Sequence, residues 1–198
     1  MTVFGRVFEN REVRDPSFLR FFFDNQGMAP VWLLARLYLG WQWLHAGWDK
    51  LTGDGWMNQN GVALQGFWER QVQQPEEGRP PITYDWYRDF IQYMLDHEWY
   101  EWFAPVIAVT EVAVGLLLIA GAFTAVAAFF GAFLNFNFLL AGSASTNPVL
   151  FVLALLLIAA WKTAGYIGVD RWLLPALGAP WSPGSVFRRD EADRRPET

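Results

Sequence analysis

The chain has 198 residues, a formal net charge of −5 and no cysteine. The acidic balance argues against nucleic-acid binding, which requires a basic patch, and the lack of cysteine excludes disulfides and cysteine-ligated metals or clusters. The average composition is that of a soluble protein, yet the 50 residues between Glu111 and Lys162 include no charge. Because a membrane-spanning helix needs about 20 apolar residues, this stretch predicts a membrane protein.

The predicted helices follow from apolar runs and the residues that interrupt them. Residues 1–29 mix charges with phenylalanines and lack the apolar core of a signal peptide, so we expect an amphipathic segment on the cytoplasmic membrane surface. Membrane spans are expected at about residues 30–51, 103–121, 124–140 and 147–167. The predicted fold class is therefore an all-α membrane protein, an antiparallel bundle of four transmembrane helices.

The first connection, residues 52–102, is too long for a simple turn. Apolar residues recur at helical spacing from Tyr87 to Leu95, and residues 62–74 show a weaker helical pattern. The linker 75–81 is rich in proline and glutamate. We predict a helical cap with its tryptophans at the level of the lipid headgroups, and a solvated acidic loop is the alternative.

The distribution of charge predicts the orientation in the membrane. The region from Leu51 to Trp102 has a net charge of −6, whereas the terminal segments hold most of the basic residues. The positive-inside rule then places residues 1–29 and the tail 176–198 in the cytoplasm, and the cap outside. Residues 30–175 form the membrane domain in this interpretation.

Several polar residues lie inside the predicted spans, where a charge costs roughly 2.5–3.5 kcal/mol. At about 1.5 Å per residue, His45, Glu111 and Asn135 fall at one shared depth, about 10 Å below the outer helix ends. Trp41 and Trp48 share a face with His45, which we expect to point inward. A buried carboxylate beside a neutral histidine can exchange protons near pH 7. Glu111 and His45 are therefore candidate catalytic residues, and the alternative is a polar clasp that only fixes helix pairing.

Arg36 lies half a helical turn out of phase with His45. We expect it to form a structural ion pair with Asp170 near the cytoplasmic end, since intramembrane charges usually pair; a ligand contact is the alternative. The chain shows no haem-, metal- or flavin-binding motif. Any electron transfer would then need a redox centre supplied by another component.

The motifs of the spans resemble the DoxX family. The similarity rests on Arg36…Gly40…His45-Ala46-Gly47…Lys50-Leu51, on Glu111…Gly115…Gly121…Thr124, and on the closing stretch Gly165–Arg171. The segment from Asn135 to Pro148, which includes Asn137, resembles the DoxD branch, the membrane subunit of thiosulfate:quinone oxidoreductase. The family often has an arginine after the threonine of the second motif, where this chain has Ala125.

The resemblance implies a multi-pass protein of a prokaryotic inner membrane, linked to quinone and to sulfur or thiol redox chemistry. In this interpretation Glu111 and His45 exchange protons with a quinone. Asn135 or Asn137 bonds a quinone carbonyl, and Trp41 or Trp48 lines the ring pocket. Electrons arrive from a membrane or extracytoplasmic partner protein. The resemblance to the DoxD branch suggests thiosulfate as the substrate. The alternative functions are a non-catalytic anchor that docks a partner through the cap, and a small-molecule carrier, for which broken-helix signals are lacking.

Overall fold

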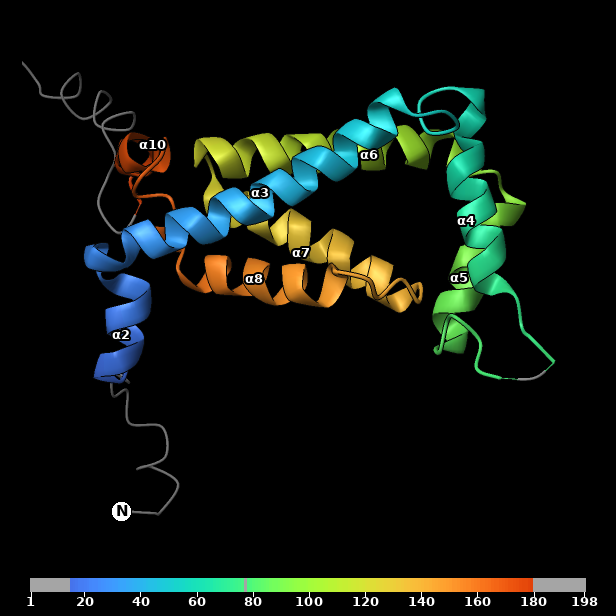
Figure 1. Ribbon diagram of the computed structural model, residues 1–198, viewed down its shortest axis with the longest axis horizontal. Helices are drawn as coiled ribbons and strands as arrows, with labels where there is room; N and C mark the ends of the chain where they lie inside the picture. The colour runs from blue at the N-terminus through green and yellow to red at the C-terminus, as the bar shows by residue number, and fades with distance from the viewer. Residues whose placement is uncertain (1–14, 77, 180–198) are drawn as a thin grey trace, which may run out of the picture.

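The computed structural model describes residues 15–76 and 78–179. Four helices lie side by side and run alternately in opposite directions (Figure 1): α3 (Ala29–Thr52), α6 (Tyr100–Ala120), α7 (Thr124–Leu140) and α8 (Asn147–Ala159). The remaining helices are α2 (Ser17–Asp24), α4 (Val62–Val72), α5 (Asp85–Asp96), α9 (Trp161–Ala164) and α10 (Asp170–Leu177), with short 3-10 turns at Gln26–Met28 and Gln59–Gly61. No strand occurs in the described ranges. The predicted all-α antiparallel bundle is therefore present.

The two ends of the bundle differ. Helices α4 and α5 stand across one end, which we call the cap end, and α2 and α10 lie at the opposite end (Figure 1). Both ends of the described chain thus lie at the same end of the bundle, as an even number of antiparallel helices requires. The predictions for residues 1–14 and 180–198 fall outside the described residues.

Of the helices in the described ranges, only α6 is both long and apolar enough to cross a membrane, with a mean hydropathy of 2.3 over its best window. α3 has 24 residues, but it includes Arg36, Asp49 and Lys50. α7 and α8 are apolar but have 17 and 13 residues, fewer than the roughly 20 of a typical span.

The fourth helix is shorter than predicted. It ends at Ala159, and α9 follows after Ala160, whose backbone is not helical. The break is stabilised by Thr163, whose hydroxyl donates to the carbonyl of Phe23 at 2.8 Å and contacts the carbonyl of Ala160 at 3.2 Å. The sequence also did not indicate α10, which continues past the domain boundary predicted at residue 175.

Glycines bring α3 and α6 into backbone contact. A Cβ added at Gly115 would lie 2.5 Å from the backbone nitrogen of Leu44, and one added at Gly47 would lie 2.6 Å from that of Val112. A Cβ at Gly40 would lie 3.0 Å from the carbonyl of Gly115. Small residues permit such close approach, so the α3–α6 contact depends on these three positions.

The cap has its own apolar core. Leu64 and Trp68 of α4 pack with Ile91 and Met94 of α5, and all four side chains are buried. The helical patterns predicted at residues 62–74 and from Tyr87 to Leu95 are confirmed by α4 and α5, and these residues do not form a solvated loop. The hydroxyl of Tyr87 contacts the backbone carbonyl of Asn137 at 3.2 Å, which ties the cap to α7.

Candidate functional site

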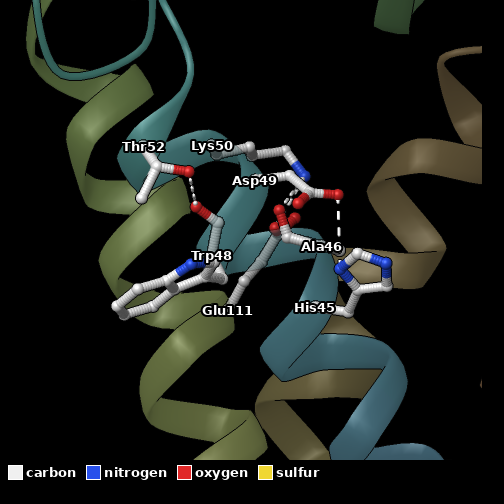
Figure 2. A network of polar contacts seen from close by, with 7 residues as sticks. All are labelled: His45, Ala46, Trp48, Asp49, Lys50, Thr52 and Glu111. Carbon is white, nitrogen blue, oxygen red and sulfur yellow. Dashed lines mark hydrogen bonds and ion pairs between the residues drawn. The ribbon is translucent and has the colours of Figure 1, made fainter.

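An ion pair links α3 and α6 near the cap end. Lys50 Nζ lies 2.6 Å from Oε2 of Glu111 (Figure 2). The Glu111 side chain is 1 % exposed and that of Lys50 is 19 % exposed. Lys50 also lies over the ring of Trp56, 5.1 Å from its centroid. The buried carboxylate therefore has a cationic partner that itself reaches toward the surface.

Several buried polar atoms of the bundle have no partner within the protein. Oε1 of Glu111, Nε1 of Trp43 and both amide atoms of Asn135 are buried and accept or donate no hydrogen bond within the protein. Trp43 reaches α7, because a Cβ at Gly131 would lie 2.8 Å from its Nε1. Asn135 lies one helical turn from Gly131 on the same face. Buried polar atoms are usually paired, so this group of three side chains requires an explanation.

A cavity of about 620 Å³ lies next to the ion pair, between α3, α4 and the start of α8. Its charged lining consists of His45, Asp49, Lys50, Arg70 and Glu111. Its aromatic lining consists of Trp43, Trp56, Phe67 and Phe138. The connection between α7 and α8 adds side-chain hydroxyls and an amide, from Ser143, Ser145, Thr146 and Asn147. We call this the ion-pair cavity. Its volume is typical of small-molecule sites, which span roughly 300–1,000 Å³.

His45 lies at the edge of this cavity and not beside Glu111. Its side chain is 60 % exposed, and its Nδ1 lies 3.4 Å from Asp49 on the next turn (Figure 2). Trp41 and Trp48 are 60 % and 58 % exposed and are not part of the cavity lining. The face of α3 that we expected to point inward therefore points outward.

The inward face of α3 is the one that includes Arg36, Gly40, Trp43 and Gly47, all of them buried. Lys50 continues this face and reaches Glu111, a pairing that the sequence analysis missed. The signal was available in Gly40 and Gly47, since small residues mark a helix–helix contact.

The two asparagines of α7 have different surroundings. Asn135 is fully buried in the bundle. Asn137 donates to the carbonyl of Phe133 at 2.8 Å, and its Oδ1 lies 3.3 Å from the hydroxyl of Tyr87. Neither residue lines the ion-pair cavity. Asn137 instead joins α7 to the cap.

Arg36 and Asp170 occupy a second buried polar region, at the end opposite the cap. Nη2 of Arg36 donates to the carbonyl of Ile167 at 2.6 Å, and its guanidinium lies against Gly121 and Gly168. Asp170 accepts hydrogen bonds from the backbone amides of Phe123 at 2.7 Å and Thr124 at 2.8 Å. The two side chains thus lie in one region, but each is bonded to backbone and they make no direct ion pair. Asp170 caps the start of α7, where a negative charge is favourable.

These features define a class of protein: a helical bundle with an apolar candidate span, a buried lysine–glutamate pair and a cavity beside that pair. The sequence profile of the DoxX family matches residues 31–143, from the start of α3 to just beyond α7. The chain belongs to the DoxX family, which is a family of membrane proteins. No curated protein and no solved structure matches the chain.

Proposed function

We propose that the protein is an integral membrane subunit of a quinone-linked oxidoreductase, and that the ion-pair cavity receives the quinone headgroup. In this proposal α3, α6, α7 and α8 all cross a prokaryotic inner membrane, both termini are cytoplasmic and the cap lies outside. The thiosulfate type of oxidoreductase is the variant that the DoxD-like segment suggests. The observation that carries the proposal is the Glu111–Lys50 pair, buried beside a cavity of about 620 Å³.

The lining of the cavity suits a flat, aromatic, hydrogen-bonding ligand. Trp56, Phe67 and Phe138 supply aromatic surface, and offset stacking of aromatic groups is favourable. Lys50 and the hydroxyls of the α7–α8 connection supply donors for carbonyl oxygens. Oε1 of Glu111 has no partner within the protein and is available to a ligand or a water molecule.

A quinone, when bound, accepts electrons and protons together. Glu111 has an unpartnered carboxylate oxygen beside the cavity, which would take a proton from water and pass it on to the quinone, and Lys50 binds its other oxygen at 2.6 Å. His45 and Asp49, at the exposed edge, can exchange protons with water. The chain therefore supplies groups that bind and move protons. Since it has no cysteine, and since the described residues include no cluster of side chains arranged to hold a metal, we assign the electron source to a partner protein.

The test is the substitution Glu111→Gln, which keeps the shape of the side chain and removes its proton-accepting charge. We expect quinone reduction by the assembled complex to fall by about 10²–10⁴-fold, the usual contribution of general acid–base catalysis. The matched control is Glu101→Gln, ten residues earlier on α6, where the side chain is exposed. Quinone turnover that is equal in the two variants would contradict the assignment of Glu111.

The membrane topology can be tested directly because the natural chain lacks cysteine. Single cysteines at Ser17 and at Glu76 report on the two ends of the bundle. A membrane-impermeant maleimide should label Glu76→Cys in intact cells and Ser17→Cys only after lysis. Labelling of both variants in intact cells would refute the proposed orientation.

A second candidate function is a non-catalytic anchor, supported by the aromatic surface of the cap. Tyr84, Trp86, Tyr93 and Trp102 are each at least half exposed, and aromatic residues are enriched at protein interfaces. The double variant Tyr84→Ser, Trp86→Ser should release the partner subunit from the purified complex. If the anchor function is the whole function, Glu111→Gln leaves both the complex and its turnover unchanged.

A further inference from the structure

A second, smaller cavity lies under the cap. Its volume is about 170 Å³, and it lies between α4, α5, α6 and α7. Apolar side chains make up nearly all of its lining, among them Ile91, Met94, Ile107 and Ala141. No charged residue contributes to that lining. We call it the apolar cavity.

Two polar residues of the apolar cavity are already bonded to each other. The hydroxyl of Tyr87 and the amide oxygen of Asn137 lie 3.3 Å apart. The amide nitrogen of Asn137 donates to Phe133. Burial raises the pKa of Tyr87 to about 12, so its hydroxyl stays neutral at ordinary pH. Since no charged residue lines the cavity and its hydroxyl and amide are already bonded, an apolar occupant is favoured.

The apolar cavity adjoins the ion-pair cavity. Leu64, Phe67 and Phe138 contribute to the lining of both. These three side chains border both a polar space and an apolar space. A ligand with a polar aromatic head and an apolar chain fits these two adjoining cavities, because each part of the ligand contacts groups of its own polarity.

The far side of the apolar cavity opens toward the surface of the bundle. Phe90 of α5 and Phe133 of α7 line the cavity and are 43 % and 55 % exposed. The exposed side of α7 also presents Phe129, Phe130 and Phe136. In the proposed membrane topology this surface faces lipid, so a chain that leaves the cavity here enters the bilayer without crossing water.

We propose that the apolar cavity holds the first part of the isoprenoid tail of the quinone whose headgroup occupies the ion-pair cavity. This inference rests on the proposed function. The tail passes between Leu64, Phe67 and Phe138 and leaves toward lipid between Phe90 and Phe133. An apolar cavity of about 150 Å³ stays dry and binds a molecule as small as benzene, and an isoprene unit is of similar size. The observed 170 Å³ is therefore enough for the proximal unit of the tail.

The experiment uses the full-length protein in lipid nanodiscs and a photoreactive probe. The probe is a benzoquinone with a short isoprenoid tail that has a diazirine on its first unit, and a naphthoquinone version covers the second headgroup type. After irradiation, peptide mass spectrometry locates the label. We expect label on Ile91, Met94 or Leu134, and we expect an excess of the tail-less quinone to suppress it.

Two substitutions reduce the apolar cavity without touching the ion-pair cavity: Ala141→Leu, directly after α7, and Met94→Trp on α5. Excluding roughly two methylene groups of the tail should weaken binding of the tailed quinone about tenfold. Binding of the tail-less quinone should stay unchanged, and this binding also shows that each variant is folded. The control Ala141→Ser adds little volume and should bind both quinones as the natural protein does.

The outcomes separate the tail site from the proposed function. Label confined to lipid-facing residues such as Val149 and Val152, with tail-less binding intact, refutes the tail site and leaves the quinone headgroup site in place. Equal weakening of tailed and tail-less binding in Ala141→Leu and Met94→Trp also refutes the tail site. Absence of tail-less binding by the natural protein, alone and in the assembled complex, refutes the proposed function itself, and the tail site with it.

Discussion

The Lys50–Glu111 pair predicts an asymmetric response to loss of either partner. Lys50→Met leaves a carboxylate that is 1 % exposed without its cation. Breaking a buried pair in this way costs about 3–5 kcal/mol. Glu111→Gln leaves a lysine that is 19 % exposed and can turn toward water, so its cost is about 1.5–3 kcal/mol, the value of a hydrogen bond to a charged group. The double variant removes both charges and should be less destabilised than Lys50→Met alone.

Thermal unfolding of the purified, quinone-free protein in detergent measures these differences through tryptophan fluorescence. For a chain of this size about 1 kcal/mol shifts Tm by roughly 2–4 °C, so Lys50→Met should lower Tm by about 10 °C. The matched control is Lys162→Met, which breaks a pair of similar length, 3.0 Å to Asp24, with side chains that are 38 % and 35 % exposed. An exposed pair contributes about 0–1 kcal/mol, and the control should shift Tm by only a few degrees.

The double-mutant cycle decides whether the argument holds. Coupling between Lys50 and Glu111 requires that the effects of the two substitutions do not add. Simple additivity would show that the two side chains do not interact, despite the 2.6 Å separation. Equal Tm shifts for Lys50→Met and Lys162→Met would show that burial does not determine the strength of these pairs.

Three further predictions concern the packing and the cap. Gly115→Ala places a Cβ 2.5 Å from the backbone of Leu44 and should destabilise the protein by about 1–3 kcal/mol. In the control Gly66→Ala the nearest neighbour of the added Cβ would be 3.6 Å away, and stability should rise by about 0.5–1 kcal/mol through helix propensity. Thermal unfolding in detergent measures both changes. Asp170→Asn removes the charge that accepts two backbone amides at the start of α7 and should cost about 1–3 kcal/mol by the same assay. Tyr87 has its pKa raised to about 12, above the ordinary value of 10, so its contribution to stability is complete below pH 10 and is lost as the pH rises through about 12; alkaline titration of tyrosine absorbance should lose its highest step in Tyr87→Phe and keep the others.

The sequence predicted the positions of the helices well, but it did not predict which face of α3 points into the bundle. Runs of apolar residues located α3, α6 and α7 to within a few residues of their observed bounds, because a run and its breaks depend on local chemistry alone. The rotation of a helix about its axis depends on what packs against it. His45, Trp41 and Trp48 do share a face, as their spacing requires, but that face is exposed. Polarity suggested an inward site, whereas the glycines that contact α6 determine the inward face.

The partner of Glu111 shows a second reason why spacing was insufficient. Lys50 lies on the same face of α3 as Arg36, and spacing within α3 does not indicate its partner on α6. Its side chain has a flexible four-carbon stem that can bridge between helices. Helical periodicity gives the position of a Cα and not the reach of a long side chain. The sequence also does not indicate the cavity beside the pair, since Arg70 and the α7–α8 connection line this cavity from distant parts of the chain.

The ion-pair cavity is formed partly by two closely packed helices, α3 and α6, and partly by less tightly packed segments. Arg36 and Lys50 stand about 21 Å apart along the inward face of α3, and each is bonded to the protein near one end of the bundle. Between these two residues, Gly40 and Gly47 bring the backbone of α3 against α6. Such a seam resists small displacements, because backbone contacts leave no side chain to adjust. The rest of the cavity comes from α4 and from the connection between α7 and α8, where Ser145 has a positive φ of 37°. The contact between α3 and α6 therefore determines the position of Lys50 and Glu111. Since loops tolerate variation better than packed helices, ligand specificity in the proposed function should depend on α4 and on residues 143–147.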